Sequence, residues 1–189
     1  MALITSFQRF FNPPLDYSSP AIQPLIEASY GQSAHRIEGF VKGKIPYRYD
    51  WENYNYPWYF PTVEEVLAKG SGDCKSHLVV IASILSFYEI PFSLYYSASH
   101  IWLSYQGKVE IEGETEKEVT LSYSEDKGFE FRKAETDWDR TRTIFKEANW
   151  HYMPLSKKVL LFQTFFSCLS FTLMALMIEK LKKGSEMND

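Results

Sequence analysis

Cysteine is scarce in this chain of 189 residues, which contains only Cys74 and Cys168. Two cysteines cannot form the dense disulfide framework of a small secreted domain, and Cys168 lies within an apolar run, so the pattern fits a reducing compartment. The four histidines do not share the spacing of a zinc site with these cysteines. We therefore expect no metal and no other cofactor.

A surplus of basic residues is also missing, because 20 Lys and Arg stand against 24 Asp and Glu, with a formal net charge of −4. Without a basic patch, nucleic acid is not expected to be the main partner. No basic leader with a sufficient apolar stretch opens the chain, so no secretory signal is predicted. Hydrophobic residues make up 45% of the sequence, which is enough for one compact domain of about 150 residues.

The most informative motif is the glycine-rich turn from Gly70 to Lys75, which reads Gly-Ser-Gly-Asp-Cys-Lys. Asp73 is a good N-cap, and the residues after Cys74 are apolar on almost every side until Pro91 ends the segment. This pattern predicts a buried helix that begins at Cys74. A helix N-terminus favours the thiolate form of cysteine, which is the nucleophilic form.

Secondary structure is predicted on both sides of this helix. Thr62 and Glu65 form a capping-box pattern, which predicts a short helix from Val63 to about Ala68. Downstream, the aromatic and branched segments 92–96 and 101–105 are typical of β-strands.

His100 precedes the second of these strands and is the predicted base for a Cys74 nucleophile. An isolated buried cysteine is more often an inert packing residue than a nucleophile, but burial alone does not require the glycine-rich turn before Cys74. His77 lies three residues after the cysteine on the same helix face, and we assign it a structural role. His35 and His151 belong to no catalytic pattern. Cysteine and histidine together predict acyl-transfer chemistry.

These motifs, taken in order, resemble the core of the transglutaminase-like superfamily. The resemblance covers about residues 30 to 115 and rests on the segments 45–50, 61–67, 70–74, 90–91 and 100–102. It implies an α+β fold with a papain-like arrangement, in which a central cysteine helix packs on an antiparallel sheet that supplies a histidine and then an acid. It also implies that Cys74 and His100 are catalytic.

The acid is the point at which the sequence departs from the family pattern. Family members usually carry an aspartate on the strand that pairs with the histidine strand, and here that position falls near Gly113. A two-residue hairpin loop pairs His100 with Gly113, whereas a three-residue loop puts Glu110, Glu112 and Glu114 on the histidine face. We take Glu112 as the predicted acid. The alternating glutamates equally suit a solvent-facing strand edge.

A second feature is the uncharged run of 20 residues from 159 to 178, which is long enough to cross a bilayer. Lysines flank it on both sides, and Trp150 and Tyr152 lie near its upstream end. A transmembrane helix is predicted. The alternative is a buried amphipathic helix, because Gln163, Ser167 and Ser170 recur at helical spacing. In a membrane, this polar face would contact a second copy or a membrane-protein partner.

The predicted order of the chain follows from these features. With more basic residues upstream of the run than downstream and no predicted signal, we expect a single-pass, tail-anchored protein with a cytoplasmic N-terminal domain. The expected parts are a lead-in (1–29), a transglutaminase-like domain (30–150), a juxtamembrane linker (151–158), the transmembrane helix (159–178) and a short polar tail (179–189).

Three further elements are predicted within the soluble part. A helix is expected from about Leu25 to Val41, interrupted or loosened at Gly31 and Gly39. The segments 119–123 and 129–131 are expected to form a hairpin that extends the sheet. Asp137 is expected to cap a last soluble helix.

The sequence therefore predicts a membrane-anchored cysteine acyl-transfer enzyme. As the resemblance implies, it is a peptidase or amidase that acts on a protein or peptide near the membrane. The alternative is a catalytically inactive interaction subunit of a membrane complex that keeps the same fold, an interpretation motivated by the missing aspartate.

Overall fold

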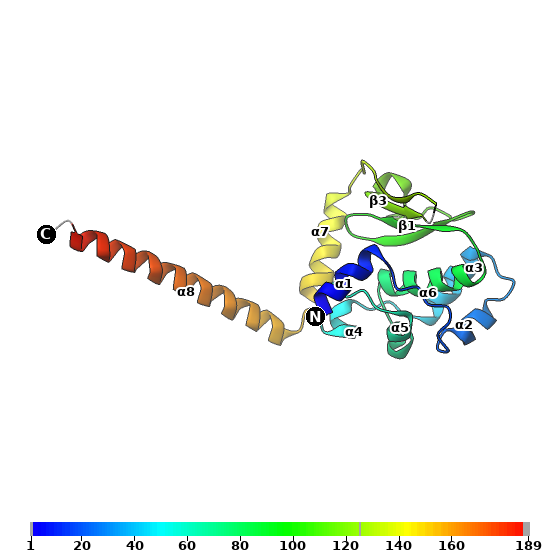
Figure 1. The fold of residues 1–189 in the computed structure, drawn as a ribbon, viewed down its shortest axis with the longest axis horizontal. Coiled ribbons are helices and arrows are strands. Elements are labelled where there is room, and N and C mark those ends of the chain that lie inside the picture. The colour runs from blue at the N-terminus through cyan, green and yellow to red at the C-terminus, as the bar shows by residue number, and fades with distance from the viewer. Residues whose placement is uncertain (1, 125, 187–189) are drawn as a thin grey trace. The chain divides into compact units, whose positions relative to one another are not determined.

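The computed structural model describes residues 2–124 and 126–186, which divide into two compact units with the boundary after Tyr152. The first unit has an α+β fold (Figure 1). Its helices are α1 (Ala2–Phe11), α2 (Gln23–Ala28), α3 (Ala34–Lys44), α4 (Asp50–Tyr54), α5 (Val63–Lys69), α6 (Cys74–Phe87), the 3-10 helix η1 (Glu116–Glu118), α7 (Trp138–Lys146) and the π-helix η2 (Glu147–His151).

The sheet has four antiparallel strands in the order β2-β1-β3-β4. They are β1 (Phe92–Tyr96), β2 (Ile101–Tyr105), β3 (Leu121–Ser124) and β4 (Gly128–Phe131). The predicted strands 92–96 and 101–105 are confirmed, and β3 and β4 form the predicted second hairpin. This second hairpin joins the sheet beside β1, which leaves β2 at the other edge.

The core lies between one face of the sheet and α6. Alternate residues of β1 and β2, such as Leu94 and Leu103, point into it, as the two-residue period of a strand requires. Helix α6 packs against β2 and, through other parts of its surface, against α3 and α5. Residues 76 to 85 of α6 are all buried, so the prediction of a buried helix after Cys74 is confirmed.

The caps that start α5 and α6 are those predicted from the sequence. The Thr62 hydroxyl accepts a hydrogen bond from the backbone N–H of Glu65, and the Glu65 carboxylate accepts one from the N–H of Thr62. The Asp73 carboxylate accepts bonds from the backbone N–H groups of Lys75 and Ser76. Asp137 caps α7 in the same way. Each cap satisfies N–H groups that a helix leaves open.

In the N-terminal region, the helix expected from Leu25 to Val41 is interrupted at Gly31, as predicted, because this residue takes a left-handed conformation with φ +68°. The two resulting helices are α2 and α3, and Gly39 lies within α3 without interrupting it. The segment predicted as a lead-in belongs to the first compact unit, and Ile22 and Ile26 are buried in its core.

The glutamate-rich strand predicted after β2 does not form. In the described chain, nothing pairs with the outer edge of β2, and residues 108 to 115 follow an irregular path that turns at Gly113, whose φ is +82°. The backbone N–H of Glu114 bonds to the carbonyl of Ile111 and closes this turn. Strand alternation therefore does not decide which glutamate side chain points toward the histidine.

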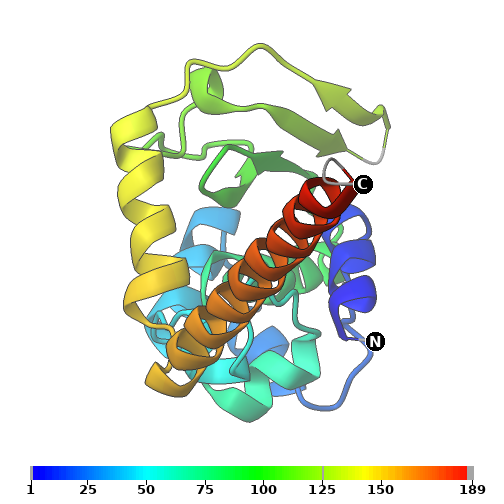
Figure 2. The same cartoon turned by 90° about the vertical axis from the view of Figure 1, so that its left-hand side faces the viewer.

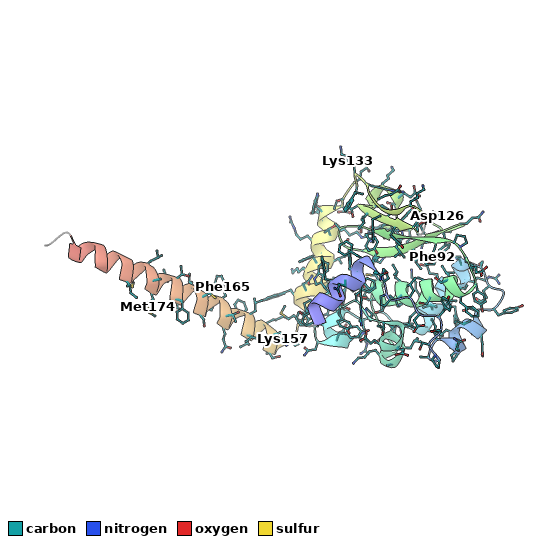
Figure 3. All side chains as sticks on the ribbon, viewed as in Figure 1. Phe92, Asp126, Lys133, Lys157, Phe165 and Met174 are labelled. Atoms are coloured by element: carbon teal, nitrogen blue, oxygen red, sulfur yellow. The ribbon has the colours of Figure 1, made fainter. Side chains whose placement is uncertain are left out.

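The second unit contains α8 (Leu155–Glu186), one helix whose part from Leu155 to Ile178 is long and apolar enough to cross a membrane. None of its most apolar window is buried. Phe165 and Met174 project outward from the helix surface (Figure 3). The hydroxyl of Ser170 donates to the carbonyl of Phe166, within the same helix.

Candidate active site

The turn that carries Cys74 is held by backbone contacts with the preceding segment. The N–H of Gly72 donates to the carbonyl of Pro46 at 3.1 Å, and the N–H of Arg48 donates to the carbonyl of Gly72 at 3.0 Å. A Cβ atom at position 72 would overlap the side chain of Ser76 in the first turn of α6, so only glycine fits. The motif thus places Cys74 as the first residue of α6, half-buried.

His100 is positioned by the tight connection between β1 and β2. The backbone N–H of Ser97 donates to the carbonyl of His100 at 2.8 Å, and the N–H of His100 donates to the hydroxyl of Ser97 at 3.1 Å. The imidazole stacks on the indole of Trp102, with ring centroids 5.8 Å apart and an interplanar angle of 14°. These contacts fix the ring, and its side chain is 23% exposed.

The carboxylate that contacts His100 is Glu114, and the prediction of Glu112 for this contact is wrong. His100 Nε2 lies 3.2 Å from Glu114 Oε1. Glu112 is exposed, and its backbone carbonyl accepts a hydrogen bond from Arg140 at 3.3 Å. The turn at Gly113 directs the two neighbouring glutamates differently, and the buried carboxylate of Glu114 meets the cationic side chains of Lys108 and Lys42.

Those cations belong to a network that the sequence analysis did not find. Lys108 Nζ lies 2.7 Å from Glu114 Oε2 and 2.7 Å from Glu38 Oε1. Lys42 pairs with Glu38 at 2.6 Å and reaches Glu114 Oε1 at 3.6 Å. The negative charges of Glu38 and Glu114 are thus balanced by the positive charges of Lys42 and Lys108. The only sequence signal was the spacing of Glu38 and Lys42, four residues apart on one helix.

The pKa of Glu114 reflects this network. Burial raises it, but the hydrogen bonds from His100 and Lys108 and the positive charges of both lysines outweigh burial and lower the pKa to about 2. Glu114 is therefore ionised at neutral pH, and its oxygens can only accept. The imidazole accordingly donates its Nε2–H to Glu114.

Cys74 and His100 also interact with each other. Burial lowers the pKa of His100, but the hydrogen bond and negative charge of Cys74, together with those of Glu114, raise the pKa to about 9. His100 is then an imidazolium at neutral pH, the form that stabilises a thiolate beside it. Cys74, His100 and Glu114 thus form a continuous relay across one side of α6.

A second charged cluster lies next to the cysteine, where Lys75 pairs with Asp50 at 3.0 Å and with Asp73. Burial and the charge of Asp73 raise the pKa of Asp50 to about 7. Burial lowers the pKa of Lys75, but the two carboxylates outweigh it and hold the pKa above its ordinary value. The cluster anchors the start of α6 to α4, which the sequence alone did not indicate.

The other histidines take no part in this relay, although His77 also lines the second of the two cavities at Cys74. His77 Nε2 lies 2.7 Å from the carbonyl of Ile45 in the core, and burial lowers its pKa, which agrees with the predicted structural role. His35 and His151 are exposed. Within residues 2–124 and 126–186, no group of three or more His, Cys, Asp or Glu side chains is arranged to hold a metal ion.

Two cavities of about 330 Å³ each meet at Cys74 and His100. The first extends between α1, α7 and η2 and is lined mainly by aromatic and aliphatic side chains. Two of them, Trp58 and Phe60, belong to residues 47–60, a segment rich in tyrosine and tryptophan. The second extends between α3, α6 and β2, where Glu38, Lys42 and Glu114 contribute to its wall. The cysteine and histidine are therefore accessible from two chemically different sides.

Comparison of the sequence with protein-family models and with curated proteins gives no match. The residues brought together are Cys74 and His100, as predicted, and Glu114, which replaces Glu112.

Proposed function

We propose that this protein is a cysteine acyl-transfer enzyme with a transglutaminase-like core and a triad of Cys74, His100 and Glu114. The observation that carries the proposal is the position of the imidazole, which lines both cavities together with Cys74 and lies 3.2 Å from an ionised carboxylate. A nucleophile, a base and an orienting acid in that order are the parts of a nucleophilic triad. The cysteine at the start of α6 and the histidine before β2 agree with the family arrangement.

The proposed reaction has two steps. In the first, the Cys74 thiolate attacks the carbonyl carbon, a C–S bond forms, and the bond to the leaving nitrogen, oxygen or sulfur breaks while His100 gives that atom its proton. In the second, His100 takes a proton from water, the water oxygen bonds to the acyl carbon, and the C–S bond breaks. The products are a carboxylic acid and the restored thiolate–imidazolium pair.

The tetrahedral intermediates carry a negative oxygen that needs a donor. Cys74 is the first residue of α6, so its backbone N–H has no partner four residues earlier within the helix. The Asp73 carboxylate takes the N–H groups of Lys75 and Ser76 instead. We assign the N–H of Cys74 as the first donor to the oxyanion.

An inactive interaction module is the weaker alternative. It was motivated by a missing acid, and Glu114 removes that ground because it contacts the imidazole directly. Hydrolysis of an amide or ester is the proposed outcome, with water as the acceptor.

The test uses the full chain in lipid nanodiscs with p-nitrophenyl acetate, a small activated ester. We expect a burst of p-nitrophenolate and an acetyl group on Cys74 by mass spectrometry. Cys74→Ala should reduce the rate to that of the uncatalysed reaction, because the covalent intermediate is lost. Cys168→Ala, the matched control, should retain the burst. A folded wild-type protein without an acetyl group on Cys74 would favour the inactive module.

We also propose that α8 anchors the protein in a membrane, with the first unit on the cytoplasmic side. The support is the apolar segment Leu155–Ile178, with Lys157 and Lys158 near its start. Only Met153 and Pro154 lie between the first unit and α8, so the active-site unit would stay close to the lipid surface.

Alkaline carbonate extraction tests the anchor. The full chain is expected to remain in the membrane pellet, because a spanning helix is not released by high pH. Residues 1–152 alone are expected in the supernatant, because this unit contains the whole core cluster. Release of the full chain into the supernatant would contradict the anchor.

A further inference from the structure

The cavity between α1 and α7 has walls suited to an apolar group. Phe7 and Phe10 come from α1, Phe145 from α7, and Trp58 and Tyr96 from the segment before α5 and from β1. Figure 2 shows α1 (blue) and α7 (yellow) on opposite sides of the helical layer beneath the sheet. At one end, the same cavity is lined by Cys74 and His100.

Several polar groups of the cavity wall already have partners. The hydroxyl of Ser6 donates to the carbonyl of Trp58 at 2.9 Å and accepts from the N–H of Phe60 at 2.7 Å. Lys75 is paired with Asp50 and Asp73. A bound peptide would need partners for a donor and an acceptor at each residue, whereas a hydrocarbon chain needs none.

Three aromatic side chains of the wall are unusually exposed for their size. Phe7 is 67% exposed, Trp58 54% and Phe145 50%. Contiguous exposed apolar surface usually marks a binding site. Trp58 also has a φ of +58°, which is rare for a bulky residue, and its indole N–H donates to Asn149 at 2.6 Å. The fold holds this ring at the cavity despite an unfavourable backbone conformation.

We propose that this cavity binds an aliphatic acyl chain, so that the substrate of Cys74 is a medium-chain fatty-acyl ester, thioester or amide. The inference rests on the proposed function and adds the chemical class of the acyl group. A group the size of a water molecule occupies about 30 Å³, so a cavity of about 330 Å³ has room for a chain of about ten carbon atoms. The cavity ends at the thiol, which places the carbonyl carbon of such a chain beside the nucleophile.

The second cavity then receives the leaving group. It is lined by Glu38, Lys42 and Glu114 and shares Cys74 and His100 with the first. His100 gives its proton to the leaving atom, so that atom must lie on the histidine side of the carbonyl. A peptide amine or a small thiol can occupy this side, and the acyl chain occupies the other.

The experiment measures alkylation of Cys74 by iodoacetamide and its N-methyl, N-hexyl and N-decyl derivatives. The full chain with Cys168→Ala is used in nanodiscs, so that Cys74 is the only thiol and each variant meets the same lipid. The rate relative to iodoacetamide is expected to rise with chain length, by up to about fourfold per buried methylene. It should level off near ten carbons.

Three variants locate the effect. Phe145→Glu puts a charge in the cavity and should remove most of the gain for the decyl reagent. Ala148→Phe should shorten the cavity and move the preferred reagent toward shorter chains, because Ala148 lines the same wall. Phe131→Glu is the matched control, because Phe131 is 86% exposed on β4 and does not line the cavity.

Equal relative rates for all four reagents, or the same profile in every variant, would overturn the acyl-chain site while leaving the reactive thiol in place. A second measurement does not depend on that thiol. A ten-carbon fatty acid with a terminal diazirine, photolysed with the full-length Cys74→Ala variant, should label peptides containing Phe7 or Phe145. Labelling confined to α8 would overturn the inference even if Cys74 proves reactive.

Discussion

Replacing His100 with alanine is expected to slow the alkylation of Cys74 by iodoacetamide at pH 6 by about 10- to 100-fold. At this pH an ordinary cysteine is only about 0.3% thiolate. An imidazolium stabilises a thiolate beside it, although a thiolate in an ion pair is intrinsically a weaker nucleophile, which reduces the gain. The prediction follows from the position of His100 beside Cys74 in the two cavities and from the pKa of about 9 for His100.

The measurement is the second-order rate of modification of the Cys74 peptide between pH 5 and 9, with Cys168→Ala as the background. The raised pKa of His100 keeps the imidazolium over most of this range, so the wild-type rate should vary little from pH 6 to 8. The His100→Ala rate should rise steeply with pH. His77→Gln is a suitable control, because it also removes an imidazole from this region. The imidazole of His77 bonds to the backbone carbonyl of Ile45. Equal rates in the wild type and His100→Ala at pH 6 would contradict the ion pair.

The second large effect is expected for Glu114→Gln, compared with Glu112→Gln as the matched control. Removing the Glu114 charge leaves Lys42, Lys108 and His100 around a neutral side chain, of which only 5% is exposed. Breaking a buried ion pair from one side costs about 3 to 5 kcal/mol of unfolding free energy. Glu112 is exposed and should change stability by less than about 0.5 kcal/mol.

The same two variants are also expected to differ in how their stability changes at acidic pH. The pKa of Glu114 is lowered from 4.5 to about 2, so its stabilisation is present above pH 4.5 and is lost as the pH falls through about 2. The shift corresponds to about 3 kcal/mol. Denaturant unfolding of the full chain in nanodiscs between pH 2 and 6 should reveal this decline in the wild type and in Glu112→Gln. An equal decline in Glu114→Gln would contradict the assignment.

The two effects separate the roles within the triad. His100 acts on the thiol directly, so its loss is expected mainly in reactivity. Glu114 contacts His100, Lys42 and Lys108. Both lysines also pair with Glu38. Its loss is expected in stability and in the orientation of the imidazole. His100 itself stabilises the fold below pH 6.5, and this contribution is lost as the pH rises through about 9.

The network accounts for the position of a glutamate beside His100, where the family resemblance led us to expect an aspartate. Glu114 extends from an irregular segment after the edge strand β2, and its carboxylate meets Lys108 at 2.7 Å as well as the imidazole at 3.2 Å. Lys42 reaches the same carboxylate at 3.6 Å. The proposed acid is therefore supported by two ammonium groups in addition to the imidazole.

Local sequence alone determined the elements that carry the proposed nucleophile, Cys74, and the proposed base, His100. The capping box at Thr62, the Asp73 cap and the apolar stretch after Cys74 specify α5 and α6 through interactions within a few residues. The segments around β1 and β2 have strand-forming composition, and His100 lies between them. Such signals depend on neighbours in the chain, so they can be recognised without the fold. The long uncharged segment of α8 is recognisable for the same reason.

Only the tertiary structure decided which acid meets His100 and which walls surround the thiol. The choice of Glu114 over Glu112 depends on the turn at Gly113 and on Lys42 and Lys108, which come from distant segments. Likewise, the apolar cavity combines α1, which the sequence analysis did not predict, with α7 more than a hundred residues later. These contacts arise from packing between segments far apart in the chain, and no local preference of either segment encodes them.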